Sequence, residues 1–214
     1  MDLKGKKVLV FGAGKSGIGA ADLLGSVEAQ PIIYDGNENL DKEAVLHKTN
    51  GKYTPEIWAG AFPEGEMESL DLVVLSPGVP TDLPLVKSFY EKGLPVWSEV
   101  ELAYRTGKGE VLAITGTNGK TTTTALLGKI MGDARESVFV VGNIGTAYTS
   151  KSLETREDSV TVAEISSFQL ETIEQFRPKV SAILNITEDH LNRHHTMEEY
   201  IRVKELITLS LIHI

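Results

Sequence analysis

The feature that most constrains the fold is a glycine loop at residues 116–124, with the sequence GTNGKTTTT. An apolar run, residues 111–115, precedes the loop, and a helix-like stretch, residues 125–131, follows it. A strand that enters a glycine loop and continues into a helix builds a phosphate site, because backbone N–H groups and the helix dipole point at the anion. The full Walker pattern has another glycine five residues before the Gly-Lys pair, where this chain has Ile114. We therefore interpret the loop as a shortened P-loop.

Individual residues of this P-loop have expected parts in nucleotide binding. Lys120 is expected to reach the terminal phosphates, and the Thr121 hydroxyl to bind Mg²⁺. The residues expected to hold ATP are Gly116, Thr117, Asn118, Gly119, Lys120, Thr121 and Thr122. The alternative is a Gly-Thr turn that caps an ordinary helix, which four consecutive threonines disfavour because threonine is a poor helix former.

The charge of the chain argues against a general nucleic-acid or anionic-membrane binder. Its 214 residues include 21 Lys and Arg against 30 Asp and Glu, a formal net charge of −9, whereas such partners select a basic excess. The chain contains no cysteine, which excludes a disulfide framework and a zinc ribbon. The N-terminus precedes only a short apolar run, residues 8–11. We therefore expect a cytoplasmic protein with neither a signal peptide nor a membrane span.

A second glycine loop lies near the N-terminus. A buried strand, residues 8–11, is followed by GAGKSG at residues 12–17, the G-x-G-x-x-G arrangement, and then by an apolar helix over 18–24. A second strand, residues 31–34, ends in Asp35, at the distance where Rossmann domains place a ribose-binding acid. Spacing alone favours NAD. The alternative is close packing of strand and helix without a ligand, since a lone G-x-G-x-x-G is a weak signal.

The rest of the first hundred residues predicts an α/β sandwich. Strands are expected at 57–60, 72–75 and 94–97, with a helix over 84–92. The SPGVP turn at residues 76–80 suits a ligand-facing loop at the carboxyl end of a strand. No acid–base set for hydride chemistry accompanies it. The polar, glycine-rich residues 106–109 mark the expected boundary between a first domain, 1–106, and a second, 107–208.

The second domain is predicted to contain a parallel sheet. Strands expected at 138–141, 160–165 and 180–186 alternate with helices, one of them over 168–176. Ligands gather at the carboxyl ends of such strands, which places Asn143 and Glu164 beside the P-loop. Glu164 is then the natural second ligand of the nucleotide's Mg²⁺. The alternative is a charge at a solvated strand end.

A histidine-rich loop follows the last of these strands. His190, next to Asp189, could bind a metal or a phosphate, and a solvated loop histidine is an equal alternative. Zinc is disfavoured because His190, His194 and His195 are too close in sequence to face one ion, and cysteine partners are absent.

The last helix carries a lysine in an unusual position. Thr196 and Glu199 form a capping box, which predicts a helix from there to about residue 207. Lys204 falls in the middle of its apolar face, which comprises Met197, Tyr200, Ile201 and Ile207. The lysine either snorkels to water or points into an active site, where desolvation makes the amine neutral and modifiable. Without further information, these physical arguments favour a lysine whose ammonium reaches water.

These motifs together closely resemble the Mur ligases. The resemblance rests on GTNGKTTTT, GNIG, EISSFQLE at 164–171 and NITEDHLNRH at 185–194, with a lysine fourteen residues after His190. The SSFQLE segment and the SPGVP turn are most similar to the members that add D-glutamate to UDP-N-acetylmuramoyl-L-alanine. The resemblance covers residues 5–208. It implies an ATP-dependent amide ligase of peptidoglycan synthesis that acts through an acyl phosphate, with a Rossmann-like first domain and a P-loop parallel-sheet central domain.

The resemblance also implies residue roles. The catalytic residues would be Lys120, Glu164, His190 and Lys204, with Thr121 and Glu164 on one Mg²⁺, His190 near a second, and Lys204 carbamylated beside it. The first domain would hold the uridine diphosphate end of the substrate in place of NAD. The implied substrate-binding residues are Gly14, Lys15, Ser16, Gly17, Asp35, Gly36, Asn37, Ser76, Pro77, Gly78, Asn143 and Ser166. Gly36-Asn37 and Asn192 depart from the family's usual residues.

The family has a third domain, which supplies the D-glutamate pocket and to which no segment of this sequence corresponds. We expect a truncated, inactive fragment of a monomeric ligase. Residues 209–214, LSLIHI, are interpreted as a non-native tail, because one set of codons for them matches a transposon end used in sequencing libraries. The alternatives are a sister Mur or folylpolyglutamate ligase, an NAD-dependent oxidoreductase, and a non-catalytic nucleotide-binding module.

Overall fold

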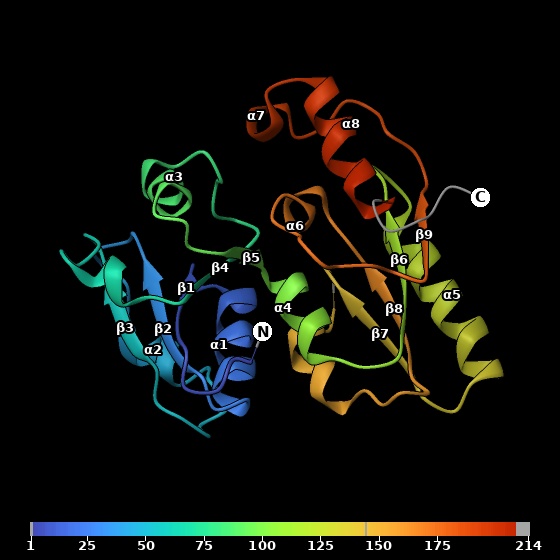
Figure 1. Ribbon diagram of the computed structural model, residues 1–214. Coiled ribbons are helices and arrows are strands. Elements are labelled where there is room, and N and C mark those ends of the chain that lie inside the picture. The colour runs from blue at the N-terminus through green and yellow to red at the C-terminus, as the bar shows by residue number, and fades with distance from the viewer. Residues whose placement is uncertain (1, 144, 209–214) are drawn as a thin grey trace. The chain divides into compact units, whose positions relative to one another are not determined.

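The computed structural model describes residues 2–143 and 145–208, so the hypothesis about residues 209–214 and the Ile144 of GNIG lie outside the described residues. The chain divides into two compact units, Met1–Leu102 and Ala103–Ile214. Each unit is built on its own parallel sheet (Figure 1). Among the described residues, no helix combines the length and the apolar character that a bilayer crossing needs.

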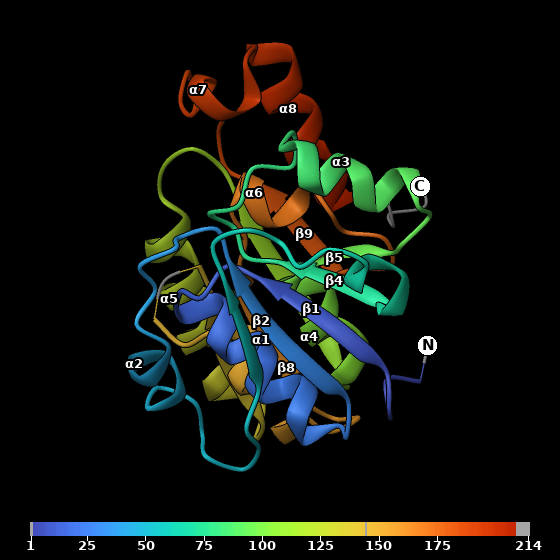
Figure 2. The same cartoon turned by 90° about the vertical axis from the view of Figure 1, so that its left-hand side faces the viewer.

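The sheet of unit 1 has the strand order β3-β2-β1-β4-β5, and all its strands are parallel. Figure 2 shows these strands running side by side, with α1 packed against β1, β2 and β4. The strands are β1 (Lys7–Phe11), β2 (Gln30–Asp35), β3 (Glu56–Ala59), β4 (Leu72–Leu75) and β5 (Val96–Ser98). The helices are α1 (Lys15–Ser26), α2 (Lys42–Leu46), α3 (Pro84–Glu91) and α4 (Glu99–Thr106), with a 3₁₀ turn η1 (Glu66–Ser69).

The central strands of unit 1 are buried on both faces. Val8, Leu9 and Val10 of β1 and the whole of β4 are buried, which is why both strands are continuous apolar runs in the sequence. The order of the strands reverses between β1 and β4. In such a sheet the loops that follow these two strands border a crevice at the carboxyl edge, which is where ligands bind.

The sheet of unit 2 has the order β7-β8-β6-β9 and is also parallel throughout. Its strands are β6 (Glu110–Thr115), β7 (Val138–Gly142), β8 (Val160–Glu164) and β9 (Val180–Ile183). The helices are α5 (Lys120–Ala134), α6 (Ser167–Leu170), α7 (Leu191–His194) and α8 (Met197–Glu205), with 3₁₀ turns η2 (Tyr148–Ser150), η3 (Ser152–Glu154) and η4 (Leu206–Thr208). The α/β class with two parallel sheets, predicted from the sequence, is confirmed.

Four of the predicted elements have clearly different bounds. The helix expected over 168–176 ends at Leu170, and Phe176 is buried outside it. β9 ends at Ile183, three residues early, because β6 ends opposite it. α5 begins at Lys120, so the threonines form its first turn. α8 ends at Glu205, and η4 continues to Thr208.

Candidate active site

The P-loop connects β6 to α5 at the carboxyl edge of the second sheet (Figure 1). Gly119 is the N-cap of α5 with a φ of 84°, a left-handed conformation that favours glycine. The Lys120 ammonium donates to the carbonyls of Gly116 at 3.0 Å and Thr117 at 2.9 Å. The lysine charge therefore lies against the loop itself, beside the positive end of the helix dipole, as a phosphate site requires.

The segment after β9 holds the P-loop in place. The Asn185 side chain accepts from the Asn118 N–H at 2.9 Å and donates to the Asn118 carbonyl at 3.0 Å. The Thr117 hydroxyl accepts from the Thr187 N–H at 3.0 Å and lies 3.1 Å from the Tyr200 hydroxyl. The sequence reasoning assigned none of these three anchors a role. Asn185 and Thr187 lie in the NITEDHLNRH motif, whereas Tyr200 was expected only as an apolar residue.

Lys204 is buried at the same loop. Its side chain is only 1% exposed, and its ammonium donates to the Gly116 carbonyl at 2.9 Å and the Thr115 hydroxyl at 3.4 Å. The ammonium also lies 4.7 Å from the centroid of the Tyr200 ring, a cation–π contact. Burial, followed by the charge of Lys120, lowers the pKa of Lys204 to about 8. The snorkelling interpretation is wrong, because the ammonium does not reach water.

The face on which Lys204 lies also differs from the predicted one. α8 buries Tyr200, Val203 and Lys204, and η4 buries Ile207, whereas Met197 and Ile201 are only partly buried. Positions three and four residues apart form a continuous stripe on a helix, and this stripe passes through Val203. Lys204 is therefore a central residue of the buried face.

Glu164 ends β8 in the middle of the sheet, in register with Ile114 and Gly142. It is 2% exposed, and its Oε1 has no hydrogen-bond partner among the described residues. The solvated strand end proposed as an alternative is therefore wrong. A buried carboxylate oxygen without a donor is costly, and a cation offsets this cost. The donor set at this position fits a divalent metal ion.

The other residue predicted to bind the first Mg²⁺ is in the turn that follows the P-loop. Thr121 occupies the exposed first turn of α5. Within the part of the chain that the structure describes, no three His, Asp or Glu side chains converge on one point. Mg²⁺ is commonly held by one or two protein groups plus phosphate oxygens and water. Thr121 and Glu164 therefore suit an ion that arrives with a nucleotide, and they do not form an all-protein cage.

His190 lies in a cluster formed by α6, α7 and α8. Its backbone is left-handed, with a φ of 54°, and it is the N-cap of α7. Its ring centroid lies 4.9 Å from that of Phe168 and 6.3 Å from that of Tyr200. Its Nε2 lies 3.4 Å from Asp189 Oδ2, and about half of the side chain is exposed. A non-glycine residue at positive φ costs about 1–3 kcal/mol and persists only where its surroundings impose it.

Two further candidates, Ser166 and Asn143, lie next to Glu164. The Ser166 hydroxyl accepts from the Gln169 N–H, and the Gln169 side chain accepts from the Ser166 N–H at 2.8 Å. This capping box starts α6. The Asn143 N–H donates to the Glu164 carbonyl at 3.0 Å, which places the GNIG segment beside the end of β8.

The candidates in unit 1 lie at or just beyond the ends of β1, β2 and β4. Gly17, in the first turn of α1, packs so closely on the first loop that a Cβ there would meet the Gly12 carbonyl oxygen at 1.8 Å. The carboxylate of Asp35, the last residue of β2, accepts the N–H groups of Ala13 and Asn37, both at 3.0 Å. The remaining candidates are Lys15 and Ser16, which begin α1, and the loop residues Gly14, Gly36, Ser76, Pro77 and Gly78. The close packing of strand and helix expected at this loop is present, and the Asp35 carboxylate fixes the loop through the Ala13 N–H.

Comparisons with known families match both units. Residues 6–98 match the family described as "Mur ligase MurD-like, N-terminal domain", and residues 114–212 match "Mur ligase middle domain". The chain is 61% identical over 208 residues to the UDP-N-acetylmuramoylalanine–D-glutamate ligase of Lachnospira eligens, covering 97% of this chain and 46% of the relative. It is 46% identical over 211 residues to the ligase of that name from Clostridioides difficile, covering 98% and 47%.

Solved structures share the fold at lower identity. A UDP-N-acetylmuramate:L-alanyl-gamma-D-glutamyl-meso-diaminopimelate ligase from Neisseria meningitides is similar with a TM-score of 0.60 at 15% identity, over 96% of this chain and 68% of that one. The UDP-N-acetylmuramate-alanine ligase of Thermotoga maritima is similar with a TM-score of 0.52 at 25% identity, over 95% and 47%. The chain spans about half the length of the curated relatives it matches.

Proposed function

This chain belongs to the Mur ligase family, and we propose that the whole protein is an ATP-dependent ligase that adds D-glutamate to UDP-N-acetylmuramoyl-L-alanine in peptidoglycan synthesis. The observation that carries the proposal is the 61% identity with a ligase of that name, which extends over both units. The chemistry proposed for the whole protein is a phosphoryl transfer from ATP to the alanyl carboxylate. The amine of D-glutamate then displaces phosphate and forms the amide.

The P-loop is suited to the first step. Phosphoryl transfer to a carboxylate brings several negative charges together, so the protein must supply position and positive charge. The Lys120 ammonium, which donates to the Gly116 carbonyl, supplies positive charge at the loop. Bound Mg²⁺ supplies further charge neutralisation on the phosphates. Thr121 and Glu164 are the residues proposed to hold it, and the unpartnered Glu164 oxygen supports that part.

Lys204 is proposed to act as a carbamate. A neutral lysine amine adds carbon dioxide and releases a proton, which converts a buried cation into an anion. The lowered pKa of Lys204, about 8, makes the neutral amine accessible near neutral pH. In this form Lys204, with His190, would bind a second metal ion beside the loop.

Unit 1 is proposed to hold the uridine diphosphate end of the substrate. The candidate loops lie at the carboxyl edge of its sheet, where the strand order reverses. Asn143 and Ser166 are proposed substrate contacts in unit 2. We propose domains at 1–106 and 107–208, with the D-glutamate pocket in the part of the protein that corresponds to the remaining length of the relatives. We also propose a cytoplasmic, monomeric enzyme.

Calorimetric titration of the 214-residue chain tests this proposal. UDP-N-acetylmuramoyl-L-alanine, ATP with Mg²⁺, and NADH are titrated separately. We expect the chain to bind the uridine substrate and ATP, and not to bind NADH. Binding of NADH in place of the uridine substrate would return unit 1 to a dinucleotide function, which the position of Asp35 at the end of β2 also allows.

A further inference from the structure

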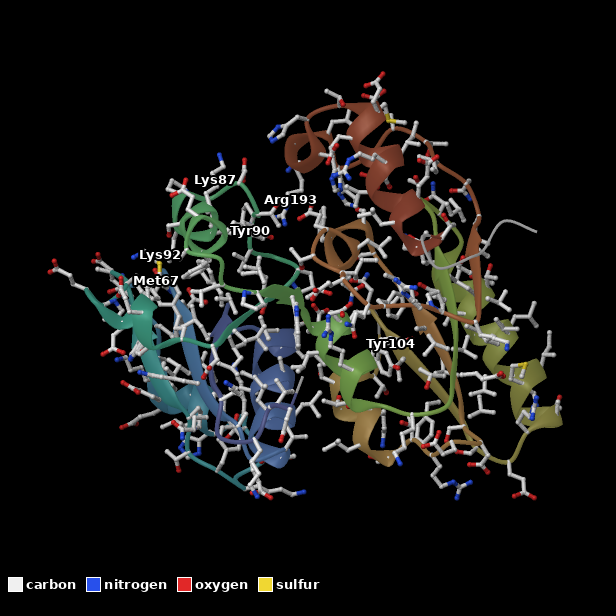
Figure 3. The ribbon with its side chains drawn as sticks, in the orientation of Figure 1. Met67, Lys87, Tyr90, Lys92, Tyr104 and Arg193 are labelled. Carbon is white, nitrogen blue, oxygen red and sulfur yellow. The ribbon has the colours of Figure 1, made fainter. Side chains whose placement is uncertain are left out.

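An ion pair joins Glu171, which directly follows α6, to Arg193 of α7, the helix that His190 caps. The Arg193 guanidinium donates to both oxygens of Glu171, from Nε at 3.1 Å and from Nη2 at 2.5 Å. The two side chains are only 12% and 9% exposed. Figure 3 shows Arg193 between these two helices. Such a pair requires its two-pronged geometry, because each charge has been taken out of water.

The same guanidinium packs against the ring that contacts His190. Arg193 Cζ lies 5.1 Å from the centroid of the Phe168 ring, and that ring lies 4.9 Å from the His190 ring. The Phe168 ring therefore contacts both the Arg193 guanidinium and the His190 ring, to which it is tilted by 54°. Glu171 and Phe168 both belong to the chain segment that begins with α6, so the ion pair fixes the ring and the guanidinium relative to each other.

A second connection holds α7 at its other end. The His194 Nε2 lies 2.9 Å from the Ser167 hydroxyl, and its Nδ1 lies 3.5 Å from Glu171 Oε1. His194 is buried, and its ring lies 5.2 Å from Tyr200, which contacts the P-loop through Thr117. α7 is a helix of four residues between two left-handed residues, His190 and His195. Its position is therefore set by these contacts and not by helix propensity.

We propose that Arg193, paired with Glu171, is a positioning residue that sets the location of the His190 ring for metal binding. This inference rests on the proposed function of His190. A buried ion pair contributes little net stability compared with an apolar pair of the same shape, so its specific value here is geometric. A guanidinium can bond both oxygens of Glu171 while its Cζ lies over the Phe168 ring. A lysine keeps the charge but cannot form the two parallel hydrogen bonds.

Nuclear magnetic resonance of the 214-residue chain measures this position without any assay of activity. The Phe168 ring shifts the ring-proton resonances of His190, which a His190→Asn variant identifies. The expected result is that Arg193→Lys and Glu171→Gln both move these resonances toward their unshifted positions. Phe168→Leu leaves the ion pair in place but removes the ring that shifts the His190 resonances, so the effect of this variant is measured by metal binding and not by these resonances.

A second readout uses Mn²⁺ with ADP as the probe. In the chain without substitutions, the paramagnetic ion is expected to broaden the His190 resonances. Arg193→Lys and Glu171→Gln are expected to weaken that broadening. Affinity for the Mn²⁺–ADP complex should fall about tenfold, as for other residues that orient a metal ligand. Arg202→Lys is the matched control. Arg202 makes a similar two-pronged pair with Glu199 on the exposed face of α8, and its replacement should alter neither readout.

The outcomes separate three failures. If Arg193→Lys and Glu171→Gln lower the melting temperature while the His190 resonances and the Mn²⁺–ADP affinity stay unchanged, Arg193 only stabilises the fold and the inference is overturned. If Mn²⁺–ADP binds the unmodified chain without broadening the His190 resonances, the metal function of His190 fails instead. If Mn²⁺–ADP does not bind the chain at all, the proposed nucleotide site fails.

Discussion

The two glycine loops of this protein occupy similar places in their sheets and have opposite electrostatics. Each follows a central strand of a parallel sheet and leads into a helix. In the first loop, the Ala13 N–H donates to the carboxylate of Asp35. In the second, the Gly116 carbonyl accepts from the ammonium groups of Lys120 and Lys204. One loop lies against an anion of the protein and the other against two cations.

Glycine spacing therefore indicates where backbone segments approach closely, but it does not indicate which ligand a loop binds. Gly17 is required by the carbonyl that lies against it, whatever the loop binds. The charge at each loop comes from distant parts of the chain, since Asp35 is 22 residues from Ala13 and Lys204 is 88 residues from Gly116.

Lys120→Ala should remove the phosphate charge of the second loop. We expect turnover of the full-length enzyme to fall by about 10²–10³-fold, as for loss of one group that stabilises developing charge. In the 214-residue chain, calorimetry should show loss of ATP affinity with the uridine substrate still bound. Lys15→Ala, at the first loop, is the matched variant and should spare ATP binding. Equal losses of ATP affinity from both variants would break the comparison.

Lys204→Ala should remove the second cation and, with it, the proposed carbamate. We expect turnover of the full-length enzyme to fall by about 100-fold and to recover when short-chain carboxylic acids are added, because a bound carboxylate replaces the carbamate. Initial rates with and without the acids measure this recovery. A rate that stays low at every acid concentration would leave Lys204 a cation of the loop only.

Gly17→Ala should destabilise unit 1, because the new Cβ would meet the Gly12 carbonyl oxygen. We expect a loss of about 2–3 kcal/mol in the free energy of unfolding, measured by urea denaturation. Gly14→Ala is the control, since its Cβ finds no atom within 4 Å and its φ is −75°. It should cost less than about 1 kcal/mol. Similar losses from both would show that packing does not distinguish the two glycines.

Lys204→Met should raise stability at neutral pH, because the buried ammonium is costly. The pKa of Lys204 falls from 10.5 to about 8 on folding, so between these values the unfolded chain holds a proton that the folded chain has lost. Stability of the unmodified chain should therefore rise from pH 8 to 10.5. We expect the variant's advantage to be about 1–3 kcal/mol at pH 7 and to disappear near pH 10.5. Urea denaturation across this pH range tests it, and a constant advantage would contradict it.

Much of the architecture follows from local patterns. Continuous apolar runs such as residues 72–75 were sufficient to predict strands buried on both faces, and glycine spacing was sufficient to predict both loops. Of the capping box predicted at Thr196 and Glu199, the bond from the Glu199 N–H to the Thr196 hydroxyl is present at 3.1 Å, while the Glu199 carboxylate accepts from Arg202. These features depend on interactions between residues that are close in the chain, so periodicity and residue type are sufficient to predict them.

The chemistry of the loops depended on contacts across the fold. Sequence reasoning favoured a snorkelling Lys204 and offered a solvated Glu164, because neither burial nor the lack of a partner can be read from neighbouring residues. The Thr117–Tyr200 contact joins residues 83 positions apart. The helix expected over 168–176 ends at Leu170, and Phe176 is buried outside it. Burial and charge at a site are sums over groups that only the folded chain brings together, which is why tertiary structure alone showed that Lys204 and Glu164 are buried.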